Sequence, residues 1–388
     1  MDRSLPAAFA WAFTVLSVAF LSQIAVSEAF LGLALCAWLV DVLWRRDAGS
    51  LAVPDVVYPM GLYALLSAGA AVTSFDPGRS IVQLRECLLF GLVLLLVNLV
   101  RTRGDLAFLL GILMAMGTVL GVWGIVQYVE LPKTILNRIH GPVGHYMTYS
   151  GMVLLIALCT VCHALSARST RSRAALGLMA AIQVVALFLT LTRSAYIGFL
   201  VAATLWIAVR VPKLLLLLPA AIIATLAIAP QHVFNRVHTM GSRRDDTTLS
   251  RYYLWRGGIA MIHDYPFFGV GPHMVRTLYL ERYRDPRTPT KSDSHLHDDV
   301  LQIAAERGIP ALFAWLSIFA VLGFRAVRAW SRDPASPTKA AAVLALVAFQ
   351  VAGVFEYNFG DSEVLLTFLV LASLPYVEDR LRSVPAPG

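Results

Sequence analysis

The chain has 388 residues, of which 58% are hydrophobic and only 14% are charged. Soluble domains carry about a quarter charged residues, so this composition excludes an ordinary soluble protein and indicates a protein of the lipid bilayer. The formal net charge of +8 does not indicate a nucleic-acid partner, because the cytoplasmic loops of membrane proteins are rich in lysine and arginine for reasons of topology.

Apolar segments recur along the whole chain, and a helical span needs roughly 20 such residues. The sequence therefore predicts an all-α integral membrane protein of about twelve spans: nine within residues 1–229, a large, partly helical loop over 230–307, and three more with a tail over 308–388. The predicted spans are 7–25, 28–44, 55–72, 81–99, 106–127, 147–165, 174–191, 195–209, 213–229, 308–327, 340–356 and 362–377.

The short loops predict the orientation of the chain. Basic residues occupy alternate short loops, and the opposite short loops are nearly free of them, so we expect both termini to be cytoplasmic. The large loop then lies outside the cytoplasm. Within it, residues 249–263 place Tyr252, Trp255, Ile259 and Ile262 on one face, which is typical of an amphipathic helix that lies on a membrane or packs on the spans.

Several arginines are candidates for binding an anion. Arg193 stands between two apolar runs with hardly any loop, and an arginine at that depth is costly unless it pairs or faces an aqueous cavity; the alternative is a side chain that snorkels to the interface. Arg251 and Arg256 lie on the predicted loop helix, where a guanidinium can bind phosphate in a bidentate manner or simply face lipid headgroups.

The segment from Ser294 to Gln302 is the densest polar cluster, with His295, His297 and two aspartates. It suggests either a metal site or a histidine that acts as a general base. We favour the base, because no third metal ligand at a suitable distance is apparent in the sequence. The carboxylate that orients the histidine is left open between three residues, Asp298, Asp299 and Glu306.

Other polar residues fall on the predicted outer side. They include a further acidic cluster between the last two spans and weaker candidates in the earlier loops: Arg85, Arg138, His140, His145, Glu356, Asn358, Asp361 and Glu363. The chain has no nucleotide-binding motif. Outward-facing arginines beside a candidate base indicate group transfer from a lipid-phosphate donor, which carries its own driving force.

Four segments, in chain order, resemble motifs of the O-antigen ligase and polymerase superfamily. Thr192-Arg193-Ser194 resembles its (S/T)-R motif, and Arg251-x-x-x-Trp255 followed by residues 266–271 resembles its long-loop signature. The stretch His297-Asp298-x-x-Leu301-Gln302-x-x-x-Glu306-x-Gly308 resembles H-N-x-x-L-Q-x-x-x-E-x-G, with Asp298 in place of the usual Asn. Residues 138–145 look like the family's Gly-containing outer loop.

The resemblance implies a WaaL-type O-antigen ligase, a GT-C-like glycosyltransferase of the Gram-negative inner membrane that acts in lipopolysaccharide biosynthesis. Such an enzyme transfers a glycan from undecaprenyl diphosphate to a sugar hydroxyl of lipid A–core at the periplasmic face, with inversion and without a metal or other cofactor. At the positions that match the family's motifs, the resemblance implies that His297 is the general base and that Arg193 and Arg251 bind the diphosphate. Four further residues are second-tier substrate contacts: Arg85, Arg138, His145 and Arg256.

Three other functions remain open on the sequence. An O-antigen polymerase or a protein O-oligosaccharyltransferase would use the same type of donor, and a single large loop late in the chain favours the ligase over the polymerase. A lipid or polysaccharide transporter would distribute charges along its spans and on both faces. Here the charges that topology does not explain gather on one face, which favours an enzyme.

Overall fold

The computed structural model describes residues 3–45, 51–131, 138–217, 246–288 and 295–383. These residues form helices and no strand. The elements are α1 Leu5–Ala19, α2 Ile24–Arg45, α3 Val57–Val72, α4 Pro77–Val82, η2 Gln83–Phe90, α5 Gly91–Leu99, α6 Arg103–Glu130, η3 Gly141–Val143, α7 Tyr146–Ser166, α8 Thr170–Leu189, α9 Arg193–Arg210, η4 Pro212–Leu217, α12 Asp246–Asp264, α13 Val275–Leu278, η5 Tyr279–Tyr283, α14 Asp299–Arg332, α15 Pro337–Gly353, η6 Asn358–Gly360, α16 Ser362–Ala372 and α17 Leu374–Ser383.

Seven helical stretches within the described ranges are long and apolar enough to cross a membrane. They are α2, the joined α4–η2–α5 stretch, α6, α7, α8, α9 and α14, and three shorter apolar helices accompany them, α1, α3 and α15. The predicted α-helical membrane protein is thereby confirmed. The count of twelve stays a prediction, because most of the predicted ninth span, 213–229, lies outside the described residues, and the predicted twelfth span is divided into α16 and α17.

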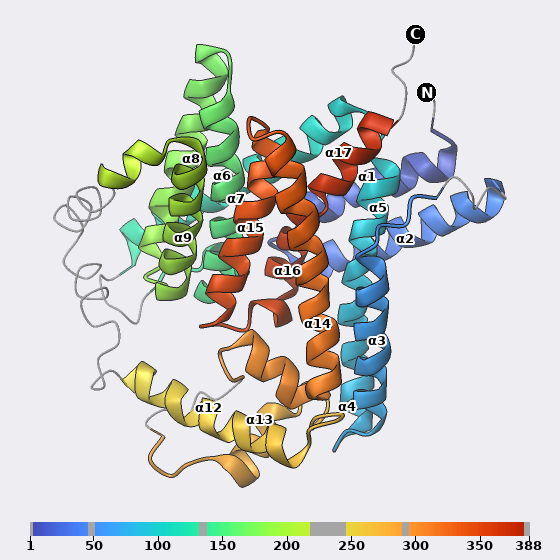
Figure 1. Cartoon of the computed structure of the whole chain (residues 1–388), viewed down its shortest axis with the longest axis vertical. Coiled ribbons are helices and arrows are strands. Elements are labelled where there is room, and N and C mark those ends of the chain that lie inside the picture. Colours follow the sequence, from blue (N-terminus) through green and yellow to red (C-terminus); the bar gives the residue numbers. More distant parts are fainter. Residues whose placement is uncertain (1–2, 46–50, 132–137, 218–245, 289–294, 384–388) are drawn as a thin grey trace.

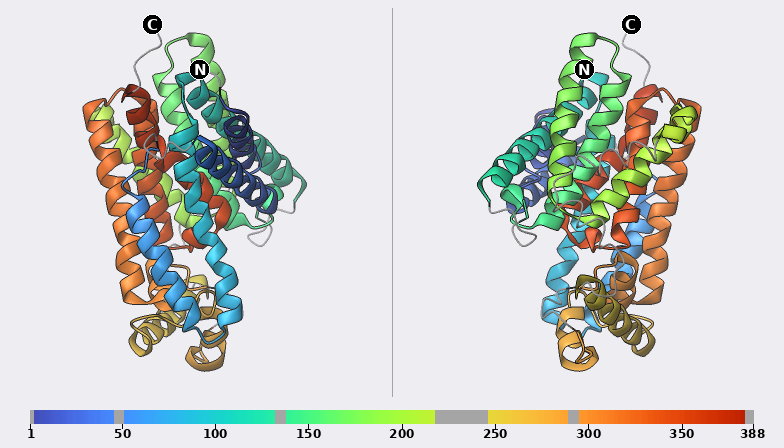
Figure 2. Two further views of the ribbon diagram at one scale, coloured as in Figure 1. Left: turned by 90° about the vertical axis from the view of Figure 1, so that its right-hand side faces the viewer. Right: turned by 90° about the vertical axis from the view of Figure 1, so that its left-hand side faces the viewer.

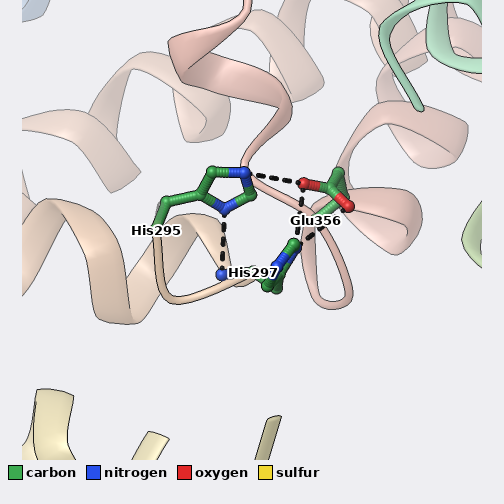
Figure 3. Close-up of side chains that lie close together, drawn as sticks. All are labelled: His295, His297 and Glu356. Carbon is green, nitrogen blue, oxygen red and sulfur yellow. Dashed lines mark hydrogen bonds and ion pairs between the residues drawn. The ribbon is translucent and has the colours of Figure 1, made fainter. Parts of the chain in front are cut away.

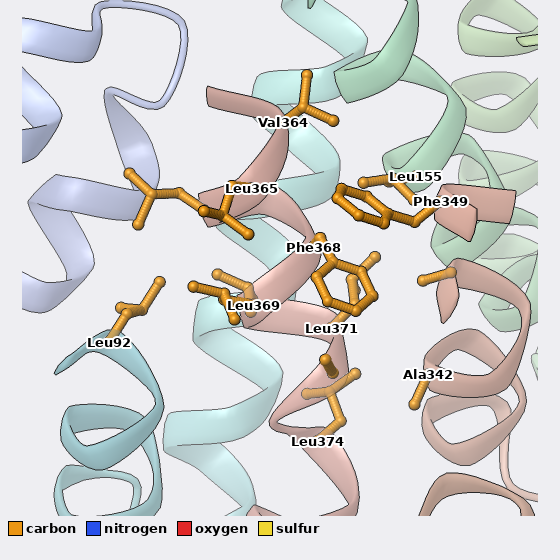
Figure 4. Close-up of a cluster of buried hydrophobic side chains, with 14 of the residues drawn as sticks. Leu92, Leu155, Ala342, Phe349, Val364, Leu365, Phe368, Leu369, Leu371 and Leu374 are labelled. Atoms are coloured by element: carbon orange, nitrogen blue, oxygen red, sulfur yellow. The ribbon is translucent and has the colours of Figure 1, made fainter. Parts of the chain in front are cut away.

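The core of the bundle lies around α7, α15 and α16. Phe349 of α15 stacks on Phe368 of α16 with ring centroids 4.4 Å apart, and Leu155 of α7 and Leu365 of α16 belong to the same buried cluster (Figure 4). In lipid, tight packing of this kind holds helices together, since burial from water offers no driving force there. This core fixes the ends of α7, α15 and α16, from which part of the candidate site is built.

Helices α12 and α13 lie across one end of the bundle, while α17 and the start of α1 lie at the opposite end (Figures 1 and 2). Leu254 and Met261 face a small core of their own beneath α12, whereas Tyr252 and Ile259 are each 58% exposed. The predicted helix is therefore present, and its predicted apolar face is divided. Tyr252 and Ile259 point outward, as in a helix that rests on a membrane surface. The ring N–H of Trp255 donates to Leu296 at 3.0 Å, and Ile262 packs on the small core, which includes Ala305 of α14.

Helix α14 is kinked at Gly308, whose φ of 82° lies in the left-handed region that favours glycine. A Cβ at this position would lie 2.1 Å from the backbone oxygen of Phe267. The turn before it runs alongside the helix, because the amide of Val270 donates to Ala305 at 2.8 Å and the amide of Ile309 donates to Pro266 at 2.8 Å. The kink thus joins two sequence motifs, the 266–271 turn and the start of α14.

A buried charge network ties η2 to α14. Arg307, 3% exposed, donates to Glu306 at 2.6 Å and to Glu86 at 3.1 Å. Glu306 also accepts from the side chain of Gln302 at 2.8 Å. Because each charge has an opposite partner, these polar residues can lie inside the protein.

Candidate functional site

A short turn before α14 holds His297 in a strained conformation. Its φ is +52°, which is uncommon for a residue with a side chain and is characteristic of functional sites. The backbone amide of His297 donates to Nδ1 of His295 at 3.2 Å, and that of Leu296 donates to Gln302 at 2.8 Å. Asp298 then caps α14 by accepting from the amide of Leu301 at 2.8 Å. An asparagine, the residue that the family motif usually has here, would cap the helix equally well, so Asp298 in its place preserves this local structure.

Glu356, from the connection between α15 and α16, lies at the centre of the site (Figure 3). Nδ1 of His297 is 3.2 Å from both of its carboxylate oxygens, and Nε2 of His295 is 3.4 Å from one of them. The guanidinium of Arg251 on α12 lies 3.9 Å away. The carboxylate is only 4% exposed. Burial favours its neutral form, but His297, His295 and Arg251 outweigh burial and lower the pKa of Glu356 to about 2. The site therefore contains a buried carboxylate that is charged at neutral pH.

The hydrogen bonds distinguish the two histidines. Burial lowers the pKa of His295 to about 4, so its ring is neutral at pH 7. Since Nδ1 of His295 accepts the amide of His297, its proton is on Nε2 and points toward Glu356. Both nitrogens of His295 are thus engaged. His297 uses Nδ1 for Glu356, and its Nε2 has no hydrogen-bond partner in the described part of the chain. His297 is the one that can accept a proton from a substrate.

Glu356 is also the third potential metal ligand that the sequence did not reveal. One ligand atom from each of His295, His297 and Glu356 lies within 4.8 Å of the others, and two histidines with a carboxylate are a donor set that zinc uses. The guanidinium of Arg251 beside Glu356 already supplies a positive charge to this carboxylate, which disfavours a second cation in the same place.

The three carboxylates considered as partners of His297 bind other groups. Asp298 caps α14, Asp299 accepts the amide of Phe359 at 3.0 Å, and Glu306 pairs with Arg307 at 2.6 Å. The expectation that one of these three orients the histidine is therefore wrong. The only sequence signal for Glu356 was its position in a polar break on the predicted outer side of the membrane, 59 residues after His297.

Two predicted second-tier residues lie on the side of the site formed by α7. His145 precedes this helix and lies 3.4 Å from Oγ1 of Thr148, which donates to Asp361 at 2.8 Å. Burial lowers the pKa of His145, and the nearby His297 and Arg138 lower it further, while Glu356 acts against them. Arg138 lies over the ring of Tyr146 at 4.3 Å. Residues 138–145 thus join the same electrostatic cluster as His297.

The remaining predicted arginines are placed differently. Arg193 is the first residue of α9, after Leu191 with a φ of +54°, and the α8–α9 turn lies at the end of the bundle that faces α12 (Figure 1). Arg256 is exposed on α12 and helps to lower the pKa of Asp285. Arg85 is exposed on η2. Neither Arg85 nor Arg256 is among the described contacts of Glu356.

Comparison with known proteins agrees with the resemblance seen in the motifs. Residues 176–316 match the family model of the O-antigen ligase domain (Wzy_C). The matched range holds Arg193, Arg251 and His297 and ends within α14. No curated protein matches the chain. The family match, on a multi-pass helical membrane protein, supports membership of the O-antigen ligase superfamily, whose members are membrane glycosyltransferase-like enzymes of O-antigen processing.

Proposed function

We propose that the chain is an O-antigen ligase of the inner membrane, which transfers a glycan from undecaprenyl diphosphate to a sugar hydroxyl of lipid A–core on the periplasmic side. The observation that carries this proposal is the pairing of His297 with the buried Glu356. A carboxylate on Nδ1 fixes the imidazole tautomer and leaves Nε2 to accept a proton. Activation of an alcohol is the chemistry that a sugar acceptor requires.

In the proposed reaction, the proton of the acceptor hydroxyl moves to Nε2 of His297. The acceptor oxygen attacks the anomeric carbon of the donor, the bond from that carbon to the diphosphate oxygen breaks, and the electron pair leaves with the diphosphate. Attack opposite to the leaving group inverts the anomeric centre. The imidazolium that forms is stabilised by Glu356, whose pKa of about 2 keeps it charged throughout.

Arg251 and Arg193 bind the diphosphate and stabilise the charge that builds on it as the bond breaks. Arg251 is supported by its position, because its guanidinium lies 3.9 Å from the carboxylate that holds His297. Guanidinium groups take the place of a metal ion in this scheme, so the reaction is independent of divalent cations. Arg85, Arg138, His145 and Arg256 are proposed as further substrate contacts.

Purified protein tests this proposal directly when it is mixed with lipid-linked glycan, lipid A–core and a chelator. We expect the coupled glycolipid from the wild type and at least about 100-fold less of it from His297→Ala. The matched control His263→Ala, at a histidine whose side chain is 88% exposed on α12, should keep full activity. Lengthened lipid-linked glycan as the product would show a polymerase instead, and glycan on protein would show a protein O-oligosaccharyltransferase. Dependence on a divalent metal would contradict the metal-free scheme.

A further inference from the structure

A cleft of about 660 Å³ opens beside the ring of His295. Its walls come from four segments: the α4–η2 helix, the turn and helix around α13, the start of α14 and the connection before α16. All four lie at the end of the bundle where α12 and α13 lie (Figure 1). The sequence motifs assign no role to this space.

Part of the lining of the cleft is cationic. Arg79 and Arg276 both line it and are exposed. Within the described ranges Arg276 has no acidic partner, and Arg79 meets only Asp76, at 3.3 Å in an exposed pair that stabilises little. His273 also lines the cleft, and its hydrogen bond to Glu86 at 3.1 Å raises its pKa. An anion that enters the cleft therefore meets two available guanidinium groups.

Partly exposed polar side chains complete the lining. Gln83 offers an amide, Thr277 a hydroxyl and Asp361 a carboxyl, whereas Gln302 and Glu306 also line the cleft but are buried and hydrogen-bonded to each other at 2.8 Å. Amides, hydroxyls and carboxyls of this kind bind sugar hydroxyls. The combination of such a wall with two guanidinium groups fits a saccharide that carries an anionic substituent.

The cleft reaches the candidate base through His295. His295 lines the cleft, and its ring centroid is 4.1 Å from that of His297, which adjoins the lining without belonging to it. Arg193 and Arg251 are not part of the described lining either. An enzyme that joins two substrates needs two binding regions that converge on the base, and Arg251 already marks the first.

We infer that this cleft binds the acceptor glycan, with Arg79 and Arg276 holding a phosphate or a sugar carboxylate while a neighbouring hydroxyl reaches His297. The inference rests on the proposed function and adds the acceptor site to it. It assigns Arg79 and Arg276 as specificity determinants for an acidic acceptor.

Steady-state kinetics with lipid A–core and lipid-linked glycan test this assignment. Arg79→Ala and Arg276→Ala should each raise the KM for lipid A–core about tenfold, the effect of one hydrogen bond to a charged group, and leave the KM for the donor and kcat within twofold. The matched control is Arg282→Ala, which removes an exposed arginine of the same segment that does not line the cleft. An unchanged acceptor KM, or a raised donor KM, would overturn the assignment.

Two modified acceptors identify the anion. If the anion is a phosphate, the wild-type KM should be higher for dephosphorylated lipid A–core than for intact lipid A–core, by about the factor that Arg276→Ala produces. The Arg276→Ala protein should have the same KM for the intact and the dephosphorylated acceptor. If the anion is a sugar carboxylate, the wild-type KM should instead be higher for carboxyl-reduced lipid A–core, and Arg276→Ala should have the same KM for the intact and the carboxyl-reduced acceptor. If the wild type has the same KM for both modified acceptors as for unmodified lipid A–core, the cleft does not recognise an anion and the inference is wrong.

Direct binding separates failure of this inference from failure of the proposed function. Binding of fluorescent lipid A–core to detergent-solubilised protein needs no turnover. If no ligated product forms, the proposed function fails, yet the cleft still predicts that Arg276→Glu weakens this binding at least tenfold relative to Arg282→Glu. Equal binding by the two variants would refute the cleft assignment whatever the activity.

Discussion

Nδ1 of His297 lies 3.2 Å from both carboxylate oxygens of Glu356, although the two residues are 59 positions apart in the chain. The pair joins the turn before α14 to the connection after α15. Because Glu356 is buried and charged, it can orient the imidazole and stabilise its protonated form without itself touching a substrate. We therefore regard Glu356 as a positioning residue and His297 as the catalytic one.

Glu356→Gln should lower kcat about 10- to 100-fold, in the range found when the hydrogen-bond partner of a functional histidine is replaced. The amide oxygen of glutamine can still accept Nδ1–H, but it supplies no charge to stabilise the imidazolium. The KM values for both substrates should stay within about twofold, which a merely structural defect would not produce. Glu363→Gln, at the start of α16, is the control and should retain kcat; an equal loss in both variants would contradict the positioning role.

Arg251→Ala should lower kcat/KM for the lipid-linked donor about 100-fold, because a charge-assisted contact to the leaving diphosphate is lost. Arg251→Lys should recover part of that loss, since the charge remains but the bidentate geometry does not. The KM for lipid A–core should change little. Loss of acceptor affinity with intact donor kinetics in Arg251→Ala would show that this arginine serves the other substrate.

Asp361 should make the protein less stable as the pH rises from 5 to 8. Burial, with a contribution from Glu356, raises the pKa of this carboxyl to about 7, against roughly 3.9 in an unfolded chain. The folded state therefore binds more protons between these values, and the stability present below pH 4 is lost as the pH rises through about 7. Asp361→Asn keeps an acceptor for Thr148, and its Tm relative to that of the wild type should rise as the pH increases from 5 to 8.

Thermal unfolding in detergent across this pH range measures the effect of Asp361→Asn. The control is Asp285→Asn, at an exposed ion pair whose hydrogen bonds to Arg287 lower the pKa of Asp285 to about 2. That carboxylate is charged from pH 5 to pH 8, so its variant should differ from the wild type by the same Tm shift throughout. A constant shift for Asp361→Asn as well would show that this carboxyl does not titrate there.

Arg307→Met should destabilise the protein by about 3–5 kcal/mol, because it leaves the buried carboxylate of Glu306 without its partner at 2.6 Å. Unfolding in denaturant measures this loss. Arg328→Met removes an exposed arginine from the far part of α14 and should change stability by less than about 0.5 kcal/mol. Equal stability of the two variants would show that the η2–α14 network does not hold the fold together.

Apolar length predicted most of the membrane helices within a few residues, because a span of lipid demands it. Two features escaped that signal. The predicted tenth span begins at 308, where α14 is kinked at the non-helical Gly308, and the helical stretch of α14 before the kink was not predicted as part of a span. Its polar residues Gln302, Glu306 and Arg307 satisfy one another inside the protein and need no apolar side chains. The apolar face predicted for α12 is divided in the structure, with Tyr252 and Ile259 exposed and Ile262 packed on the small core, because more than one face of this helix carries large apolar residues.

The motifs predicted His297 and Arg251, which the structure brings to the same carboxylate. They did not predict Glu356, because the partner of a histidine is set by tertiary structure rather than by sequence distance. Three nearer acids looked equally suitable, and local structure uses each of them elsewhere: Asp298 at a cap, Asp299 at a backbone amide and Glu306 in an ion pair.

The most direct test of the account compares His297→Ala with His295→Ala in transfer of glycan from undecaprenyl diphosphate to lipid A–core. Because Nε2 is available only on His297 within the described contacts, we expect product formation to fall at least about 100-fold in His297→Ala and much less in His295→Ala. Both proteins should remain folded in the membrane. Full ligation by His297→Ala, with or without activity of His295→Ala, would contradict the account.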